Sequence, residues 1–441
     1  MTRTVVSLTA LLLSIVLLVS GNAFLTTLLG LQLSSASYAT STIGAILVCY
    51  SVGFVVGTLQ VHHVIGRVGH IRAFSVFAAL AAVSCLAHPI WLNEYFWAAL
   101  RAITGFSIAG LLVIIESWFS SRATNSNRAA LFAVYQIVFY LAGAGGQLLI
   151  NVGDPDSFLP FTIAAVLLTL ALIPLALTRM EAPVVESAER IPFLTLWNEA
   201  STAVAAAVVC GIMIGGFYNL GPVYATEIGL ERGQTSLFMA CAIVSAMLLA
   251  WPIGYICDRN DRRRVLLGMS VATVVSAVLV TLVGGLSFIA LLICVGAFTG
   301  LAAALYPIGV AIANDRLEHH RITAASATLL LSYGVGSVLG PLVLSGTMSL
   351  LGANGFFWGA AVILIGLAGY IAWRISATDD IPVEAQEHYI AAPPEISVLA
   401  EIDPRNTDFS GYEASEGVEE VSESSAGQVD DDLQSARRRP D

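Results

Sequence analysis

The stretch GYICDRNDRRR, residues 254–264, decides how the rest of the chain is interpreted. Six of its last seven residues are charged, whereas the flanking segments SLFMACAIVSAMLLAWPI and VLLGMSVATVVSAVLVTLV are almost wholly apolar. Such a cluster is compatible with a nucleic-acid patch, a phosphate site, a catalytic loop, or a hairpin that holds two apolar helices at a membrane face. The composition of the whole chain separates these alternatives.

The chain is too apolar for a water-soluble protein. Of its 441 residues, 57% are hydrophobic and 12% are charged, whereas soluble domains carry about 25% charged residues. A helix needs about 20 apolar residues to cross a membrane. Twelve such runs predict an all-α integral membrane protein with twelve transmembrane helices, at 5–31, 42–64, 71–92, 95–119, 129–151, 159–178, 200–224, 235–257, 264–284, 287–313, 323–349 and 355–374.

The first of these runs resembles a secretory signal, but it is longer than the about 7–15 apolar residues of a signal core. We therefore expect a retained helix. Arginine predicts the orientation, because loops rich in Lys and Arg stay in the cytoplasm. Every even-numbered gap between the runs has at least two arginines within it or within two residues of it, whereas the odd-numbered gaps have only Arg232. This pattern predicts a multi-pass protein of the bacterial cytoplasmic (inner) membrane with both termini cytoplasmic.

The longest loop, residues 179–199, divides the runs into an N-terminal half (1–178) and a C-terminal half (200–376) of six helices each. The halves show a weak repeat at an offset of about 192–195 residues, which pairs Arg67 with Arg259, Gly105 with Gly300, and Gly146 with Gly340. Two pseudo-symmetric six-helix halves are typical of transporters, whose substrate site lies at the midplane between them.

The end of the chain, residues 377–441, has a different composition. Residues 381–441 hold 4 Arg and 15 Asp or Glu, which accounts for the net charge of −11. A segment so acidic and so poor in apolar residues does not bury enough surface to fold. It is predicted to be a disordered cytoplasmic tail.

No enzyme motif stands out. The sequence lacks GxSxG, HExxH, paired CxxC and Walker patterns, so we expect neither an enzyme nor an ATP-driven pump. The six cysteines have no metal-ligand spacing and are predicted to be small core residues. No metal site and no cofactor is expected.

The charged loop has the spacing Gly254-xxx-Asp258-Arg259-xx-Arg262-Arg263. Glycine permits close helix approach, and Asp258 is placed to pair with an arginine or with the N-terminus of the next helix. The pattern resembles the G-x-x-x-D-R-x-G-R-R loop of the major facilitator superfamily, whose first-half copy is degenerate here, with Gly66 at the acidic position. The resemblance implies a cytoplasmic gate formed by Gly254, Asp258, Arg259, Arg262, Arg263, Arg67 and Arg72. The alternative is simple anchoring by positive charge, while the flanking helices argue against a nucleic-acid patch.

The sequence also suggests a substrate or proton path. Arg101-xxx-Gly105 resembles the R-x-x-x-G signature of the same superfamily, whose arginine contacts substrate or transfers protons; the alternative is that Arg101 snorkels outward. Glu116 lies about 22 Å further along the same helix, as a protonatable carrier or as a gate residue paired with Arg67 or Arg122. Other polar and aromatic residues at membrane depth either line the path or join helices to one another: Asn22, Tyr135, Gln136, Tyr140, Tyr218, Asn219, Tyr306 and Tyr333.

More narrowly, VIIES (113–117), YPIGVA (306–311) and LEHHRITAASATLLLSYGVGSVLGP (317–341) resemble the YcaD-like branch of bacterial major facilitator proteins. The resemblance implies a monomeric secondary transporter that moves a small-molecule substrate across the lipid bilayer by alternating access, with protons as the coupling ion and no nucleic-acid partner. The alternatives are a non-transporting membrane sensor that signals through the acidic tail and, third, a membrane-embedded enzyme.

Overall fold

The computed structural model describes residues 2–121, 128–154, 157–177, 191–318 and 321–377, together with Pro382, Gln386 and Tyr389. Within these residues the secondary structure is helical without strands, and twelve helices are long and apolar enough to cross a membrane. The predicted fold class is confirmed. The first six spans are formed by α1 (Thr2–Ser35), α2 (Thr40–Val68), α3 (His70–Ala87), α4 (Glu94–Ser120), α5 (Arg128–Leu148) and the pair α6 (Leu159–Leu170) and α7 (Leu172–Leu177). The other six are α8 (Phe193–Glu227), α9 (Arg232–Cys257), α10 (Arg262–Val283), α11 (Phe288–Asn314), α12 (Ile322–Leu351) and α13 (Gly355–Ala377).

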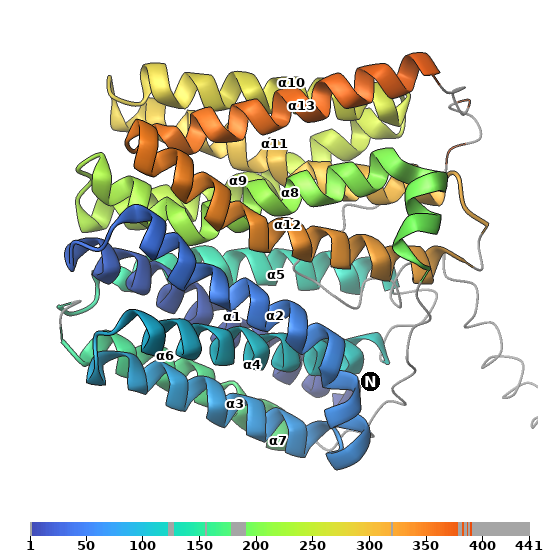
Figure 1. The fold of residues 1–441 in the computed structure, drawn as a ribbon. Helices are drawn as coiled ribbons and strands as arrows, with labels where there is room; N and C mark the ends of the chain where they lie inside the picture. Colours follow the sequence, from blue (N-terminus) through green and yellow to red (C-terminus); the bar gives the residue numbers. More distant parts are fainter. Residues whose placement is uncertain are drawn as a thin grey trace, which may run out of the picture.

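The two sets of helices form two halves that lie side by side (Figure 1). The start of α1 and the end of α13 lie at the same end of the bundle, which we call the termini side; the opposite end is the far side. The halves meet where α1 packs against α8, α2 against α12, and α5 against α9.

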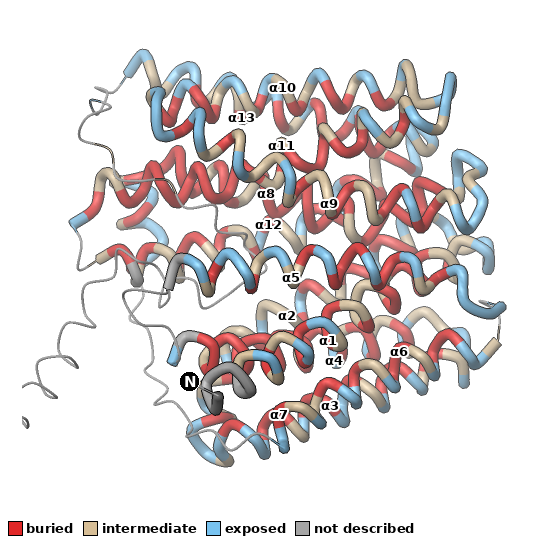
Figure 2. The backbone as a smooth tube through the Cα atoms, turned by 180° about the vertical axis from the view of Figure 1, so that it is seen from behind, coloured by how far each residue is buried: buried red, intermediate tan, exposed pale blue. Residues whose placement is uncertain are grey.

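Buried residues face the inside of each half and exposed residues face outward (Figure 2). Many of the exposed positions carry large apolar side chains, for example Val83, Leu248 and Val362, whose side chains are 65%, 63% and 70% exposed. An outer surface of this kind is unfavourable in water and favourable in hydrocarbon. The outer surface therefore suits contact with lipid tails, while most of the core inside the bundle is apolar as well.

The internal repeat is visible in how the glycines pack. A Cβ atom on Gly105 of α4 would overlap the carbonyl group of Tyr50 on α2, and one on Gly300 of α11 would lie 2.9 Å from the carbonyl oxygen of Ser245 on α9. In each half these are the fourth and second spans. Close approach of two helix backbones requires a residue without a side chain, so the matched glycines hold equivalent crossings in the two halves.

Hydrogen bonds join the halves on the far side. Thr40 donates to Glu227 at 2.7 Å, and Asn151 donates to Ser236 at 2.9 Å. Arg232 donates from Nη1 to the carbonyl of Gly153 at 3.2 Å. All three bonds are at least partly exposed to solvent, where a hydrogen bond exchanges easily with water.

One predicted boundary needs correction. The expected loop 179–199 ends earlier, because α8 already begins at Phe193 and only departs from helical geometry at Ala200, with φ −138° and ψ 49°. The polar residues of FLTLWNE lower its hydropathy but do not prevent a helix, and Phe193 and Leu194 remain exposed. Residues 178–190 lie outside the described residues, as does the predicted tail apart from Pro382, Gln386 and Tyr389.

Candidate functional site

Arg101 lies inside the protein and does not snorkel. Its side chain is 0% exposed, although it is only about 10 Å from the start of α4. The guanidinium carbon lies 4.4 Å from the ring centroid of Tyr50 on α2, which covers one face of the cation. Such a cation–π contact stabilises a desolvated arginine by about 2 kcal/mol.

Asn22 and Asn219 complete this cluster. Asn22 on α1 donates from Nδ2 to the Tyr50 hydroxyl at 3.0 Å. Asn219 on α8 accepts a long hydrogen bond of 3.5 Å from Nη2 of Arg101, and its own Nδ2 is used by the carbonyl of Gly215 at 2.8 Å. Because α8 belongs to the second half, the cluster spans the surface where the two halves meet. We call Arg101, Tyr50, Asn22 and Asn219 the Arg101 cluster.

The Arg101 cluster has unused hydrogen-bonding capacity. Nε and Nη1 of Arg101 and Oδ1 of Asn22 are buried without a hydrogen-bond partner among the described residues. Among the described residues, the ionisable groups Tyr50, Cys49 and His88 interact electrostatically with Arg101, and none of the three is a carboxylate. A buried cation without a counter-ion is costly in a membrane protein and marks a functional position.

Glu116 forms a second polar contact, entirely within the first half. Its side chain is 0% exposed, and the Tyr135 hydroxyl of α5 donates to Oε1 at 2.9 Å. Arg67, one of the partners expected from the sequence, is exposed at the end of α2, and Arg122 lies outside the described residues. A carboxyl group held by a tyrosine inside the bundle can accept and release a proton.

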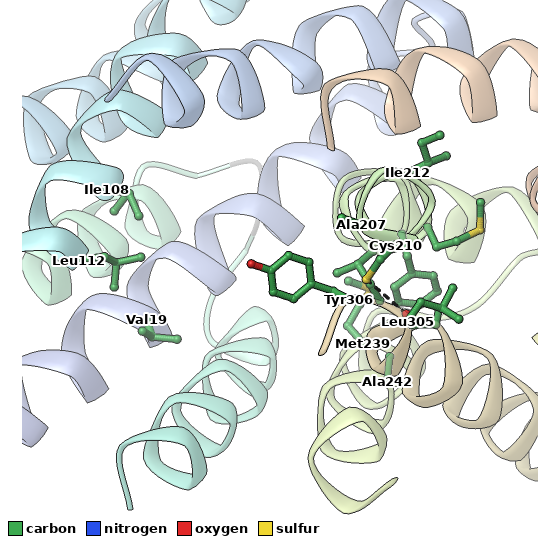
Figure 3. Close-up of a cluster of buried hydrophobic side chains, with 14 of the residues drawn as sticks. Val19, Ile108, Leu112, Ala207, Cys210, Ile212, Met239, Ala242, Leu305 and Tyr306 are labelled. Carbon is green, nitrogen blue, oxygen red and sulfur yellow. Dashed lines mark hydrogen bonds between the residues drawn. The ribbon is translucent and has the colours of Figure 1, made fainter. Parts of the chain in front are cut away.

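The remaining residues of the predicted path lie on α5, α8, α11 and α12. Tyr140 is buried with Ile243 between α5 and α9, and Gln136 is half-buried on α5. Tyr306 and Tyr333 form an edge-to-face pair with ring centroids 5.7 Å apart. Figure 3 shows Tyr306 pointing from the second half toward the side of the bundle that carries Ile108, Leu112 and Val19.

The predicted gate is divided between buried and exposed groups. Arg262 donates from Nη1 to Asp315 at 2.6 Å and to the carbonyl of Ala311 at 3.1 Å, and the two charged side chains are only 2% and 4% exposed. Arg263 is buried as well. The remaining three arginines of the predicted gate, Arg67, Arg72 and Arg259, are exposed. The guanidinium carbon of Arg259 lies 3.6 Å from the ring centroid of Tyr255.

Of the two roles expected for Asp258, pairing with an arginine or capping the next helix, the second is taken by another residue. The N-cap of α10 is Asp261, which accepts from the amide of Arg264 at 2.9 Å. Asp258 instead accepts from the backbone amide of Tyr389 at 2.7 Å. The charge cluster therefore contains one acid that caps α10 and one that binds a residue from the end of the chain.

The Tyr389 ring packs on α9, where a Cβ on Gly254 would lie 3.0 Å from it. Burial raises the pKa of its hydroxyl well above the ordinary value, so the group stays neutral. Beside it, burial and the cations Arg263 and Arg374 lower the pKa of Arg316. A small pocket here is lined by Asp261, Arg262, Arg263, Ile312, Asp315, Arg316 and Gln386.

The described residues contain no group of three His, Cys, Asp or Glu side chains placed to hold a metal ion. The six cysteines are free thiols. Cys210 donates to the carbonyl of Ala302 at 3.3 Å inside an apolar cluster (Figure 3), which is the core role that the sequence predicted.

Sequence reasoning missed three residues of these contacts: Tyr50, Asp315 and Tyr389. Tyr50 is a tyrosine within an apolar run, the same signal that singled out Tyr140 and Tyr306, so it could have been found. Asp315 and Tyr389 carried no local signal, because their partners are 53 and 131 positions away in the chain.

Comparison with known proteins agrees with this architecture. The family model of the Major Facilitator Superfamily matches residues 11–297 and 206–398. Two uncharacterized MFS-type transporters named YcaD are similar to the chain: that of Escherichia coli O7:K1 is 32% identical over 339 residues, and that of Salmonella arizonae 29% over 335 residues. Both alignments cover 75% of this chain and 86% of the relative.

Solved structures share the fold at low sequence identity. The nucleoside transporter NupG superposes with a TM-score of 0.68 at 14% identity, over 86% of this chain and 99% of NupG. A bacterial homologue of the lysosomal transporter Spinster gives a TM-score of 0.69 at 14% identity, over 86% of this chain and 97% of its own. A D-xylose–proton symporter gives 0.60 at 14% identity, over 83% and 96%.

Proposed function

The chain belongs to the Major Facilitator Superfamily, and we propose that it is a secondary transporter that moves a small solute across the bacterial cytoplasmic membrane by alternating access, coupled to protons. The observation that carries this proposal is the Arg101 cluster. It brings a buried cation from the first half, which no carboxylate among the described residues is seen to neutralise, against Asn219 of the second half. A solute bound there contacts both halves, so its binding and release are linked to their relative movement.

The hydrogen bonds between the halves support such a movement. The bonds Thr40–Glu227 and Asn151–Ser236 close the far side and lie between exposed or half-buried groups. Each contributes about 0.5–1.5 kcal/mol, so solute binding supplies enough free energy to exchange them. Arginine placement further supports a cytoplasmic termini side, which a reporter enzyme fused to the C-terminus would test.

Glu116 is the residue that we assign to the proton. It is buried on the same helix as Arg101, and Tyr135 holds its carboxyl group. Protonation neutralises a carboxylate and so lowers the free energy needed to transfer it from water into the apolar protein interior. Protonation of Glu116 therefore biases which side of the bundle is open.

Distances between spin labels test the movement without knowledge of the solute. Ala36 in the first half and Ile228 in the second are exposed on the far side, so labels there report its opening. We expect two distance populations in nanodiscs, with the balance shifted by pH. Labels at Ala36 and Leu92, both in the first half, are the control and should give one distance. A single unchanging distance for the Ala36–Ile228 pair between pH 5 and 8 would refute alternating access driven by protons.

A membrane sensor is the second candidate, favoured by the contact of Tyr389 with Asp258 and Gly254. This contact joins Tyr389, which follows the last membrane span in the sequence, to the loop that follows α9. Removal of residues 381–441 separates the two functions. In a transporter the Ala36–Ile228 distances still interconvert after the deletion, whereas a sensor loses its output although the bundle is intact.

A further inference from the structure

The charge balance of the Arg101 cluster restricts what it binds. Arg101 supplies one positive charge, and the described ionisable groups that act on it, Tyr50 and Cys49, are not carboxylates. A bound monoanion neutralises this charge, whereas a dianion leaves a net negative charge in a medium of low dielectric. A neutral solute leaves the cation uncompensated.

The geometry of the cluster restricts the ligand further. The guanidinium carbon lies 4.4 Å from the Tyr50 ring centroid, and Nη2 donates to Asn219. Nε and Nη1 have no acceptor among the residues described around them. Each open edge of the guanidinium pairs one of these nitrogens with Nη2, whose bond to Asn219 is long at 3.5 Å, and a planar carboxylate accepts two parallel hydrogen bonds along such an edge.

Asn22 adds a requirement at a second point. Its Nδ2 is used by the Tyr50 hydroxyl, while Oδ1 is buried and lacks a hydrogen-bond donor within the described part of the chain. An unpaired buried acceptor costs about 1–3 kcal/mol. A ligand with its own donor, such as a hydroxyl group next to the carboxylate, satisfies Oδ1 and Arg101 together.

We propose that the Arg101 cluster binds a small organic monocarboxylate that carries a hydrogen-bond donor, such as a 2-hydroxy acid. The proposal rests on the transport function proposed above and names its substrate class. In this arrangement Arg101 holds the carboxylate, Asn22 accepts from the donor, and Asn219 brings the second half onto the bound solute. The long 3.5 Å bond between Arg101 and Asn219 is then exchanged for bonds to the solute.

The test is binding of named probes to the full chain in nanodiscs, measured by calorimetry. We expect lactate and glycerate to bind, acetate to bind about 10-fold more weakly because it lacks the hydroxyl, and glycerol, succinate and inorganic phosphate to bind weakest. Arg101→Gln should weaken glycerate binding about 100-fold, and Arg101→Lys, which keeps the charge, by less. Asn22→Ala should abolish the difference between glycerate and acetate. Arg321→Gln, at a half-exposed arginine of the second half, is the control and should leave the affinity unchanged.

A structural role for Arg101 makes the opposite prediction for stability. Removing an uncompensated buried charge should leave the melting temperature of the ligand-free protein unchanged or raise it, whereas loss of a structural arginine lowers it. The proposal is overturned if no monocarboxylate of the panel binds, if Arg101→Gln leaves glycerate binding intact, or if phosphate or succinate binds more tightly. The Ala36–Ile228 distances separate the two proposals: interconversion without carboxylate binding overturns only the substrate class, and binding without interconversion overturns only transport.

Discussion

The buried ion pair Arg262–Asp315 offers a quantitative test of how the charged loop is built. Nη1 of Arg262 lies 2.6 Å from Oδ1 of Asp315, and the two side chains are 2% and 4% exposed. Replacing Asp315 by Leu leaves the Arg262 cation without its carboxylate, while Nε and Nη2 of that arginine already lack an acceptor among the described residues. Replacing Arg262 by Met leaves the carboxylate instead.

The magnitude follows from burial. Removal of one partner from a buried pair costs about 3–5 kcal/mol, because the other charge stays in a medium of low dielectric. Replacement of both partners by apolar residues of similar volume is neutral or stabilising. We therefore expect each single variant to lower the free energy of unfolding by about 3–5 kcal/mol, and the double variant to lie within about 1 kcal/mol of the wild type.

The molecule contains a matched control. Arg321 and Glu199 form an ion pair at 3.1 Å, but their side chains are 30% and 35% exposed. Ion pairs at the surface contribute about 0–1 kcal/mol, since water screens them. The same replacements, Glu199→Leu and Arg321→Met, should therefore change the free energy of unfolding by no more than about 1 kcal/mol each.

The assay is reversible unfolding by SDS titration, with both double-mutant cycles measured in the same detergent. If Asp315→Leu costs no more than Glu199→Leu, or if the effects of Arg262→Met and Asp315→Leu simply add, the pair is not the buried anchor that its geometry indicates. The reasoning from burial to free energy would then be refuted for this loop.

Three further outcomes are expected. Glu116→Gln keeps an acceptor for the Tyr135 hydroxyl but cannot take up a proton, so the pH-dependent shift in distance between the halves should disappear while both states persist; an unchanged pH response would contradict the assignment. Gly105→Ala forces a Cβ onto a neighbouring backbone and should cost about 1–3 kcal/mol by SDS titration, whereas Gly366→Ala, with open space around it, should not destabilise. Tyr389→Ala uncovers the α9 surface around Cys257, which is 0% exposed, and should raise its maleimide labelling several-fold in a background without other cysteines; unchanged labelling would mean that the ring does not cover this surface.

The candidate site was only partly accessible from the sequence. Arg101 and Glu116 stood out because a charge within an apolar run is rare and costly. Which residues they contact did not follow from the sequence: Tyr50 lies on another helix, and Asn219, although predicted to line the path, lies 118 positions away from Arg101 in the second half. Hydropathy identifies which residues lie inside the membrane, but it does not state which helix faces which.

The charged loop shows the same division. Its position between two spans and its positive charge follow from composition, and both are independent of packing. The role of each acidic residue depends on how the helices pack. Asp261 caps α10, Asp315 pairs with Arg262, and Asp258 accepts a hydrogen bond from the amide of Tyr389. The first-half copy of the motif lacks an acid, and its arginines Arg67 and Arg72 are exposed.

The sequence alone predicted the membrane surroundings, the number of helices and their division into two sets of six, since the bilayer forces each span to satisfy its own backbone hydrogen bonds and to present apolar side chains. These requirements are local, because each membrane span is determined by about 20 consecutive residues. Only the tertiary structure showed that Arg101 contacts Asn219 across the two halves and has no carboxylate partner among the described residues. It also showed that Arg262 is buried against Asp315, and that Tyr389 packs against α9. Those facts depend on distances between residues far apart in the chain, which only the packing of helices at their glycine contacts sets.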